Sequence, residues 1–261
     1  MKLACQENLV PGESLSEKLA KLEDWGYEGV EFQGRNLRER VAEVKRSLKG
    51  RKVKPASICA GYRGCLLDSN PAERDLAMND IKELLVVGGD IGVVGLIVVP
   101  IFGPPRLPDA SPLFDAREFQ RKIFMAQLKE LAETAEKAKC AVLVEPLNRY
   151  ETHWINRLDQ AVAMVRRIGS DYVKIMADFF HMNIEEADIP ASIKKAGKYI
   201  AHIHLADSNR VLPGLGHTDF KAGFAALKGV GFKHFMALEC GVPGDPAVLL
   251  PKAAEYLRGC M

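Results

Sequence analysis

Short apolar runs rich in valine and isoleucine alternate along the chain with longer amphipathic stretches. Parallel strands that are covered by helices read as continuous apolar runs, because both faces of such a strand are buried. Eight strand and helix pairs are expected, with the strands near residues 2–5, 28–32, 54–59, 94–100, 140–145, 172–178, 200–205 and 235–239. The pattern therefore predicts an α/β protein, a single (β/α)8 TIM barrel over residues 1–261.

The amphipathic stretches carry the start and stop signals of helices. Ser14 and Glu17 have the spacing of a capping box, and Gly26 is placed to end the helix that they begin. The apolar residues of this helix fall on one face, which should lie against the barrel: Leu15, Leu19, Leu22 and Trp25. Helices are likewise expected near residues 115–138 and 188–197.

Two long connections interrupt the otherwise short loops, one after the fourth strand and one after the seventh. Residues 101–114 contain four prolines, and residues 206–219 contain one proline and two glycines. Either loop could cover a bound substrate, since both are expected at the carboxyl ends of the strands, on the face that carries the site. In the first loop the prolines could equally only stiffen an exposed segment. In the second loop a functional role is favoured, because Asp207 and Arg210 follow His204 so closely.

Four polar side chains close four of the expected strands. Each of them follows an apolar run: Glu145, Asp178, His204 and Glu239. They lie 33, 26 and 35 positions apart (178−145, 204−178 and 239−204). This spacing fits one strand, one helix and two loops, and every strand of a β/α barrel brings its last side chain to the same face. One such acid alone could equally pair with lysine or arginine, but four at this spacing predict a divalent-metal site on strands 5 to 8.

The ligand types of this quartet indicate its chemistry. Three carboxylates and one imidazole form a hard set, which suits Mn²⁺, Mg²⁺ or Co²⁺ better than the thiolate-rich sets of structural zinc sites. A metal ion that bridges a carbonyl and the neighbouring hydroxyl acidifies the C–H bond of the hydroxyl carbon and stabilises the enediolate that forms. A carboxylate beside that carbon can then act as the base. Glu145 and Glu239, expected on strands five and eight, could flank such a substrate.

Composition and charge narrow the class of partner. A chain of 261 residues is long enough for one barrel, which typically needs about 250 residues. Lysine and arginine total 36 against 34 acidic residues, so a net charge of +2 gives no strong field to attract nucleic acid or an anionic membrane. The expected partner is therefore a small molecule. The six cysteines include no C-x-x-C pair, and no long apolar targeting segment is seen, which favours a reduced, cytoplasmic enzyme.

The second half of the chain resembles a known family. The motifs that carry the resemblance are EPLNRYE at residues 145–151, DFFHMN at 178–183, HIHLADSNR at 202–210 and PGLGHTDF at 213–220. They are similar to motifs of the xylose-isomerase-like TIM barrel superfamily, and within it to the D-tagatose and D-psicose group of ketose 3-epimerases. The resemblance covers residues 140–240, whereas residues 1–139 share only the alternation of strands and helices.

The resemblance implies a function and a role for each site residue. It implies an isomerase, an epimerase that inverts C3 of a ketose or keto-sugar acid through a cis-enediolate. One divalent ion, usually Mn²⁺, would be held by the four strand-end side chains. Glu145 and Glu239 would lie on opposite sides of C3 as acid and base. His181 and Arg210 would hold the oxygen at C2, and Glu151 would contact the substrate near C1.

Five further polar residues are open to a functional or a structural interpretation. Glu31 and Gln33 belong to the second strand region. Tyr62 and Arg63 follow the third strand, and all four are candidates to contact the far end of the substrate. Arg63 could recognise a carboxylate or phosphate, although a solvated arginine is the more ordinary interpretation. His202 is expected to point away from the barrel interior and to be structural.

Several rival functions share this fold. Aldose–ketose isomerases of the hydroxypyruvate isomerase type and inosose dehydratase-type lyases use the same metal and enolate chemistry, and the sequence separates them poorly. A nuclease of the endonuclease IV type would need additional histidine and acidic ligands, and the near-neutral charge argues against it. An inert barrel acting as a binding protein would be expected to have lost a ligand or a base. The substrate's carbon number and the presence of a homo-oligomer stay open.

Overall fold

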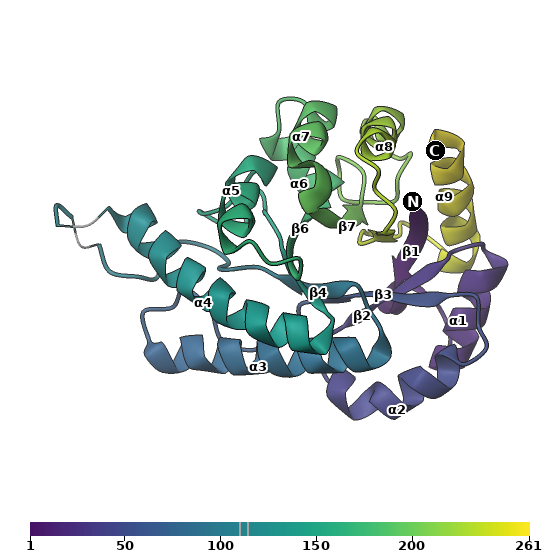
Figure 1. Ribbon diagram of the computed structural model, residues 1–261. Coiled ribbons are helices and arrows are strands. Elements are labelled where there is room, and N and C mark those ends of the chain that lie inside the picture. Colours follow the sequence, from purple (N-terminus) through teal and green to yellow (C-terminus); the bar gives the residue numbers. More distant parts are fainter. Residues whose placement is uncertain (110, 114) are drawn as a thin grey trace.

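Eight parallel strands close into a barrel in the computed structural model, which describes residues 1–109, 111–113 and 115–261 (Figure 1). Each strand pairs with the next in sequence order, and β8 pairs with β1 to close the sheet. The strands are β1 (Lys2–Gln6), β2 (Gly29–Gln33), β3 (Lys54–Cys59), β4 (Gly95–Val98), β5 (Ala141–Val144), β6 (Val173–Asp178), β7 (Ile200–Leu205) and β8 (Phe235–Leu238). The fold that the sequence predicts is therefore confirmed.

Helices surround the barrel (Figure 1). In the described part of the chain they are α1 (Leu15–Asp24), α2 (Leu37–Leu48), α3 (Pro71–Ile91), α4 (Ala116–Ala138), α5 (Leu158–Ile168), α6 (Phe179–Glu185), α7 (Ile189–Ala196), α8 (Phe220–Gly229) and α9 (Pro246–Cys260). Single 3-10 turns cover Glu7–Leu9 and Gly197–Tyr199. None of the described helices is long and apolar enough to cross a membrane. The short helix α6, which starts directly after β6, is an element that the sequence does not predict.

The first helix begins where its sequence predicts, but only half of the expected capping box forms. Ser14 Oγ accepts a hydrogen bond from the backbone N–H of Glu17 at 3.2 Å. The Glu17 carboxylate accepts from the N–H of Glu13 at 3.0 Å rather than from that of Ser14. The helix still buries its predicted leucine face: Leu15, Leu19 and Leu22.

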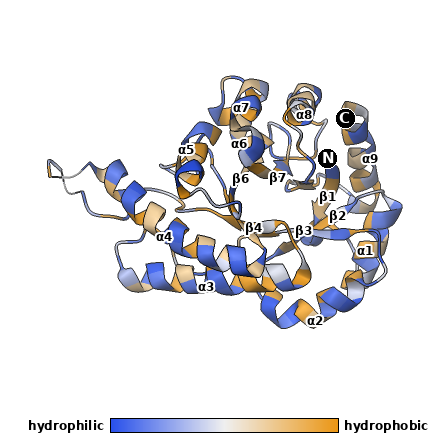
Figure 2. Cartoon of the chain, viewed as in Figure 1, coloured by the Kyte–Doolittle hydropathy of each residue, from blue (hydrophilic) through white to orange (hydrophobic). Residues whose placement is uncertain are grey.

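The apolar core lies mainly between the outside of the barrel and the helices, whose hydrophobic and hydrophilic positions alternate around each axis (Figure 2). Leu19 of α1 and Phe32 of β2, for example, belong to the same buried cluster. Alternate strand positions point into the barrel instead, and several of these carry polar side chains. Glu31, Ser57 and His204 are all fully buried there. Buried polar groups need hydrogen-bond partners or ligands, so the barrel interior is where chemistry is to be sought.

The two long loops are each tied down. After β4, Gly103 forms an isolated parallel bridge with Thr152 of the loop that follows β5. The Thr152 hydroxyl donates to the Ile101 carbonyl at 2.7 Å, which fastens the two loops together. Ala110 and Phe114, which belong to the predicted connection 101–114, lie outside the described residues.

The loop after β7 folds around one buried carboxylate. Asp207 accepts hydrogen bonds from the backbone N–H groups of Ser208 at 2.7 Å, Gly214 at 2.8 Å and Thr218 at 3.0 Å. Three bonds from separate points of the loop to one side chain give this segment a defined shape. Arg210 lies within it, so the loop sets the position of that guanidinium group.

Candidate metal centre

The four strand-end side chains meet at the carboxyl end of the barrel. Asp178 ends β6 and His204 lies near the end of β7, where the two residues are register partners. Glu145 directly follows β5, and Glu239 directly follows β8. Each of the four offers a ligand atom, and these atoms all lie within 4.8 Å of one another. The structure therefore brings the predicted quartet together.

The quartet is compact and mostly shielded from solvent. His204 Nδ1 lies 3.0 Å from Glu239 Oε2 and 3.9 Å from Glu145 Oε1. Asp178, His204 and Glu145 are buried. The side chain of Glu239 keeps 23% of its surface exposed, so it is the member most open to a small molecule from solvent.

Two atoms of the quartet provide a test of whether a metal ion fits. Among the described residues, Asp178 Oδ2 and His204 Nδ1 are buried side-chain atoms without a hydrogen-bond partner. The other Asp178 oxygen, Oδ1, accepts from the Phe180 backbone N–H at 2.7 Å and caps α6. A buried polar atom without a partner costs about 1–3 kcal/mol, and a cation bound by both atoms would remove that cost. The residues present therefore fit a divalent ion with a hard, oxygen-rich ligand set.

The pKa values in the cluster reflect crowded negative charge. Burial raises the pKa of Glu145 well above its ordinary value, and the nearby carboxylates of Glu239 and Asp178 add to the effect. Burial alone would also raise the pKa of Glu239, but the positive charge of the protonated His204 ring beside it outweighs burial and lowers the pKa to about 2. Burial alone would lower the pKa of His204, yet Glu239 and Glu31 raise it well above the ordinary value. Such a site favours a bound positive charge.

His181 reaches the quartet from the unpredicted helix α6. Its Nε2 lies 3.6 Å from Asp178 Oδ2 and 4.0 Å from Glu145 Oε1. Its Nδ1 lies 2.8 Å from the side-chain amide nitrogen of Asn148 and 3.3 Å from the backbone nitrogen of the same residue. Because both of these nitrogens are donors, Nδ1 is the acceptor and Nε2 carries the proton. The Nε2–H group therefore points toward the site. Asn148, which fixes this orientation, is a residue that the sequence interpretation missed.

Arg210 and Glu151 form an ion pair beside the quartet. Arg210 Nη1 lies 2.5 Å from Glu151 Oε1, and its Nη2 lies 3.9 Å from Glu239 Oε2. The guanidinium carbon lies 4.8 Å from the centre of the Phe180 ring, at cation–π distance. The amide of Asn148 donates to Glu151 Oε1 at 2.9 Å. The three side chains that were predicted to bind substrate thus lie around the four predicted ligands.

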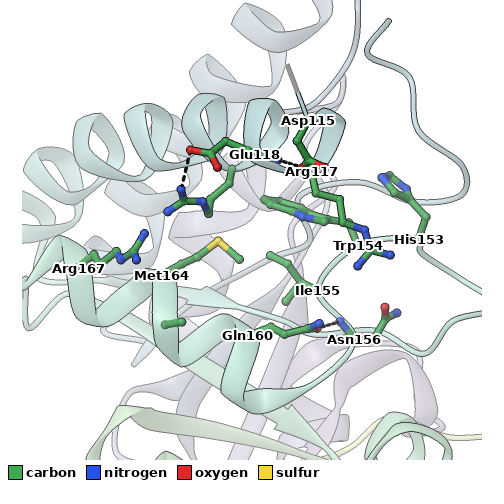
Figure 3. A pocket seen from close by; sticks show the side chains of 12 residues that line it. Asp115, Arg117, Glu118, His153, Trp154, Ile155, Asn156, Gln160, Met164 and Arg167 are labelled. Carbon is green, nitrogen blue, oxygen red and sulfur yellow. Dashed lines mark hydrogen bonds and ion pairs between the residues drawn. The ribbon is translucent and has the colours of Figure 1, made fainter. Parts of the chain in front are cut away.

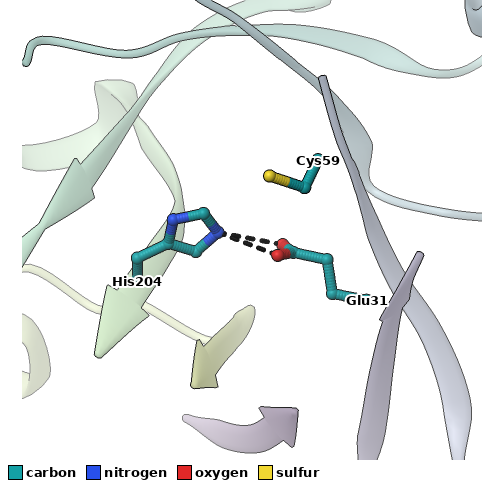
Figure 4. Close-up of side chains that lie close together, drawn as sticks. All are labelled: Glu31, Cys59 and His204. Carbon is teal, nitrogen blue, oxygen red and sulfur yellow. Dashed lines mark hydrogen bonds and ion pairs between the residues drawn. The ribbon is translucent and has the colours of Figure 1, made fainter. Parts of the chain in front are cut away.

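The prediction that His202 points away from the barrel interior is wrong. Residues two positions apart on a strand share a face, so His202 and His204 both point inward. His202 Nε2 lies 2.8 Å from Glu31 Oε2. Glu31 itself is fully buried inside the barrel, with its two oxygens 3.0 and 3.1 Å from His204 Nε2 (Figure 4). The sequence interpretation named Glu31 only as a candidate contact for the far end of the substrate, whereas the structure places it against the two histidines. Its position between Val30 and Phe32 of an apolar strand is the sequence signal for a carboxylate inside the barrel.

The remaining candidates from the first half of the chain have local partners. Arg63 is largely exposed and pairs with Asp80 of α3 at 2.8 Å, which agrees with its interpretation as a solvated arginine. The Tyr62 hydroxyl donates to the Val99 carbonyl at 2.8 Å and accepts from the Val99 N–H at 2.9 Å. Gln33 is exposed at the end of β2. None of these contacts involves the quartet.

A separate hollow of about 440 Å³ lies beside α4 and α5 (Figure 3). Arg117 and Glu118 of α4 line it together with Trp154, Met164 and Arg167. No predicted ligand, base or substrate contact is among its described lining residues. The hollow therefore takes no part in the candidate metal centre.

Comparisons with known proteins bear on this centre. The family model described as xylose isomerase-like TIM barrel matches residues 19–260. The chain is 30% identical over 265 residues to the 3-dehydro-D-guloside 4-epimerase of Escherichia coli (strain K12), with 100% of both chains covered. It is 32% identical over 231 residues to the D-psicose 3-epimerase of Agrobacterium fabrum (strain C58), covering 85% of this chain and 77% of the relative. The crystal structure of the apo form of 3-keto-D-glucoside 4-epimerase from E. coli superimposes with a TM-score of 0.91 at 28% identity, covering 100% of both chains.

Proposed function

Because the chain belongs to the xylose isomerase-like TIM barrel family, we propose that it is a divalent-metal-dependent sugar epimerase, an enzyme of the isomerase class. One observation carries the proposal. Three carboxylates and a histidine meet at the carboxyl end of the barrel, where two of their buried atoms lack a hydrogen-bond partner among the described residues. The ligands are Glu145, Asp178, His204 and Glu239. We propose Mn²⁺ as the ion, with Mg²⁺ and Co²⁺ as alternatives.

The names of the relatives suggest one shared reaction. A ketose 3-epimerase inverts the carbon next to a ketone at C2, and a 3-dehydro sugar 4-epimerase inverts the carbon next to a ketone at C3. Both reactions remove a proton from a hydroxyl-bearing carbon beside a ketone and return one to the opposite face. We therefore propose that this enzyme inverts such a carbon through a cis-enediolate. C3 of a ketose or keto-sugar acid is the first candidate. The full-length similarity to the E. coli 4-epimerase favours C4 of a 3-keto glycoside as a second.

Two glutamates would move the protons. Glu145 follows β5 and Glu239 follows β8, so they approach the centre from different sides of the barrel. One carboxylate would take the proton from one face of the substrate carbon, and the other would deliver a proton to the opposite face. A divalent ion, when bound, would polarise the ketone and the adjacent hydroxyl group.

Three other side chains would hold the substrate. The His181 Nε2–H group and the Arg210 guanidinium would donate to the oxygen that becomes negatively charged in the enediolate. The charge of arginine is permanent, so it stabilises that oxygen without a proton transfer. Glu151, held by Arg210 and Asn148, would accept a hydrogen bond from a substrate hydroxyl group. The proposed partner is a small sugar or sugar acid. The six free cysteines agree with the proposed cytoplasmic location.

A substrate panel tests the proposal. Metal-stripped protein would be assayed with and without Mn²⁺ on ketohexoses, ketopentoses, keto-sugar acids and 3-keto glycosides, with products followed by proton NMR. We expect Mn²⁺-dependent formation of the epimer at the carbon beside the ketone. An aldose product would favour the isomerase alternative, and loss of water from an inositol-derived ketone would favour the lyase. Cleavage of abasic DNA would favour the nuclease.

A further inference from the structure

A buried carboxylate outside the quartet stands behind its histidine. Glu31 on β2 is fully buried and has no part in the proton transfers proposed above. Its oxygens lie 3.0 and 3.1 Å from His204 Nε2, the ring nitrogen opposite the one that faces Glu239 (Figure 4). Three more side chains converge on the same carboxylate: Gln6 at 2.9 Å, Ser57 at 2.5 Å and His202 at 2.8 Å.

The arrangement has two chemical interpretations, and the contacts decide between them. Glu31, Cys59 and His204 lie close enough together to hold a second metal ion. However, both oxygens of Glu31 already have partners. Oε1 accepts from Gln6 and lies beside His204, and Oε2 accepts from Ser57 and lies beside both histidines. The unpartnered buried atom of His204 is Nδ1, on the other side of the ring. The contacts therefore favour a hydrogen-bond network around Glu31 over a second metal site.

We propose that Glu31 is a positioning residue that fixes His204 as a metal ligand, an inference that rests on the metal centre proposed above. A carboxylate that accepts the Nε2–H bond selects one tautomer and leaves the lone pair on Nδ1. That atom is the one that lies 3.0 Å from Glu239 Oε2 and 3.9 Å from Glu145 Oε1. Glu31 thereby directs the ring toward the ligands that share the ion with it.

The network extends to a second ligand through Gln6. Its amide nitrogen lies 2.9 Å from Glu31 Oε1 and 3.1 Å from Glu239 Oε1, so one NH₂ group bridges the two carboxylates. Ser57 and His202 hold the other oxygen of Glu31. A single carboxylate thus orients a histidine ligand directly and a glutamate ligand through one amide. Changing such a partner behind a metal ligand typically weakens metal binding by about tenfold to a hundredfold.

Titration calorimetry with Mn²⁺ tests the proposal. The substitution Glu31→Gln keeps the size of the side chain but replaces one carboxylate oxygen with an NH₂ group. In the variant, some of the hydrogen-bond donors around residue 31 therefore face another donor in place of an acceptor. We expect the Mn²⁺ dissociation constant to rise by about tenfold to a hundredfold. Ser57→Ala is the matched control, because it removes one bond to the same carboxylate and leaves the contact with His204. Its affinity should stay within about threefold of wild type, since only the contact with His204 sets the ligand tautomer.

Two results distinguish a failure of the role proposed for Glu31 from a failure of the proposed metal centre. Wild-type affinity in a folded Glu31→Gln variant overturns the positioning role and leaves the metal centre standing. Failure of the wild-type protein itself to bind Mn²⁺ contradicts the proposed function. A measurement on unmodified protein covers the case in which the variant does not fold. In ¹⁵N-labelled protein loaded with diamagnetic Zn²⁺, the His204 ring should show a protonated Nε2 and a metal-bound Nδ1. A ring bound to Zn²⁺ through Nε2 overturns the inference.

Discussion

The substitution Asp207→Asn should loosen the loop that carries Arg210. Asp207 Oδ1 accepts from the N–H groups of Ser208 and Thr218, and Oδ2 accepts from that of Gly214. Asparagine keeps the shape of the side chain but has only one oxygen. At least one of the three backbone N–H groups must then face an NH₂ group, and the other bonds lose the charge of the acceptor.

The hydrogen bonds to Asp207 determine how much stability the substitution should cost. A hydrogen bond to a charged group contributes about 1.5–3 kcal/mol, so the free energy of unfolding should fall by at least that amount. For a chain of this size each kcal/mol lowers Tm by roughly 2–4 °C, which predicts a decrease of roughly 3–12 °C. Arg210 has a backbone φ of 59°, in the left-handed region, and its N–H donates to the Asp207 carbonyl at 2.8 Å. A loosened loop should release this conformation and lower kcat by up to about a hundredfold.

The pH dependence of this effect has a definite sign. Burial alone would raise the pKa of Asp207, but hydrogen bonds from the backbone N–H groups of Thr218, Ser208 and Gly214 outweigh it and lower the pKa below its ordinary value. A carboxyl group whose pKa is lower in the folded state stabilises that state fully above its unfolded pKa and loses this contribution as the pH falls through the folded pKa. The difference in stability between wild type and Asp207→Asn should be complete at neutral pH and should shrink as the pH falls through the lowered pKa of Asp207.

Denaturant unfolding at neutral and acidic pH, together with steady-state kinetics, measures both effects. Asp219→Asn is the control from the same loop. Asp219 accepts one bond from the Ala222 N–H at 2.9 Å as the N-cap of α8, and asparagine caps a helix about as well. This control should unfold and turn over like wild type. Wild-type stability and kcat in Asp207→Asn would refute the role assigned to the loop carboxylate.

Further predictions concern the metal and the oxyanion. Replacing Asp178 or His204 with alanine should weaken Mn²⁺ binding and abolish the metal-induced rise in Tm, because a ligand bound only by the folded state stabilises that state. Full Mn²⁺ occupancy of both variants, measured by elemental analysis, would remove these two residues from the ligand set. Arg210→Ala should lower kcat by roughly 10²–10³ while leaving Mn²⁺ affinity unchanged. Arg63→Ala, which breaks only a largely exposed pair with Asp80, should leave kcat unchanged, and equal rates in the two arginine variants would contradict the role of Arg210.

The sequence predicts the barrel and the place of the quartet for the same reason. Each strand of the barrel is an apolar run whose end is marked by a change in polarity, and the four proposed ligands are residues at such a change. Glu145, Asp178, His204 and Glu239 could therefore be located from their positions alone. Neither the barrel nor the position of the quartet had to be inferred from contacts between side chains.

The barrel interior was harder to predict, because its polar residues lie within strands rather than at their ends. Glu31 sits between Val30 and Phe32, whose outward side chains make β2 read as a buried apolar strand. His202 lies two positions before His204 on the same strand. Because side chains two positions apart on a strand point to the same face, His202 points into the barrel as His204 does. Helix α6 was missed because it starts without a connecting loop, directly on Asp178, whose carboxylate is both its cap and a proposed ligand.

Hydrogen exchange in D₂O shows whether Glu145 and Glu239 act on opposite faces of one substrate carbon. The wild-type enzyme and the variants Glu145→Gln and Glu239→Gln would be loaded with Mn²⁺, checked for occupancy, and given the sugar that wild type epimerises. Wild type should incorporate deuterium at the inverted carbon beside the ketone. Neither variant should invert that carbon, because positioned proton transfer typically contributes roughly 10²–10⁴ in rate. One variant should still exchange the hydrogen of the starting sugar without inversion, through its remaining carboxylate. Inversion at a near-normal rate in either variant would show that the replaced glutamate does not transfer a proton to or from the substrate carbon.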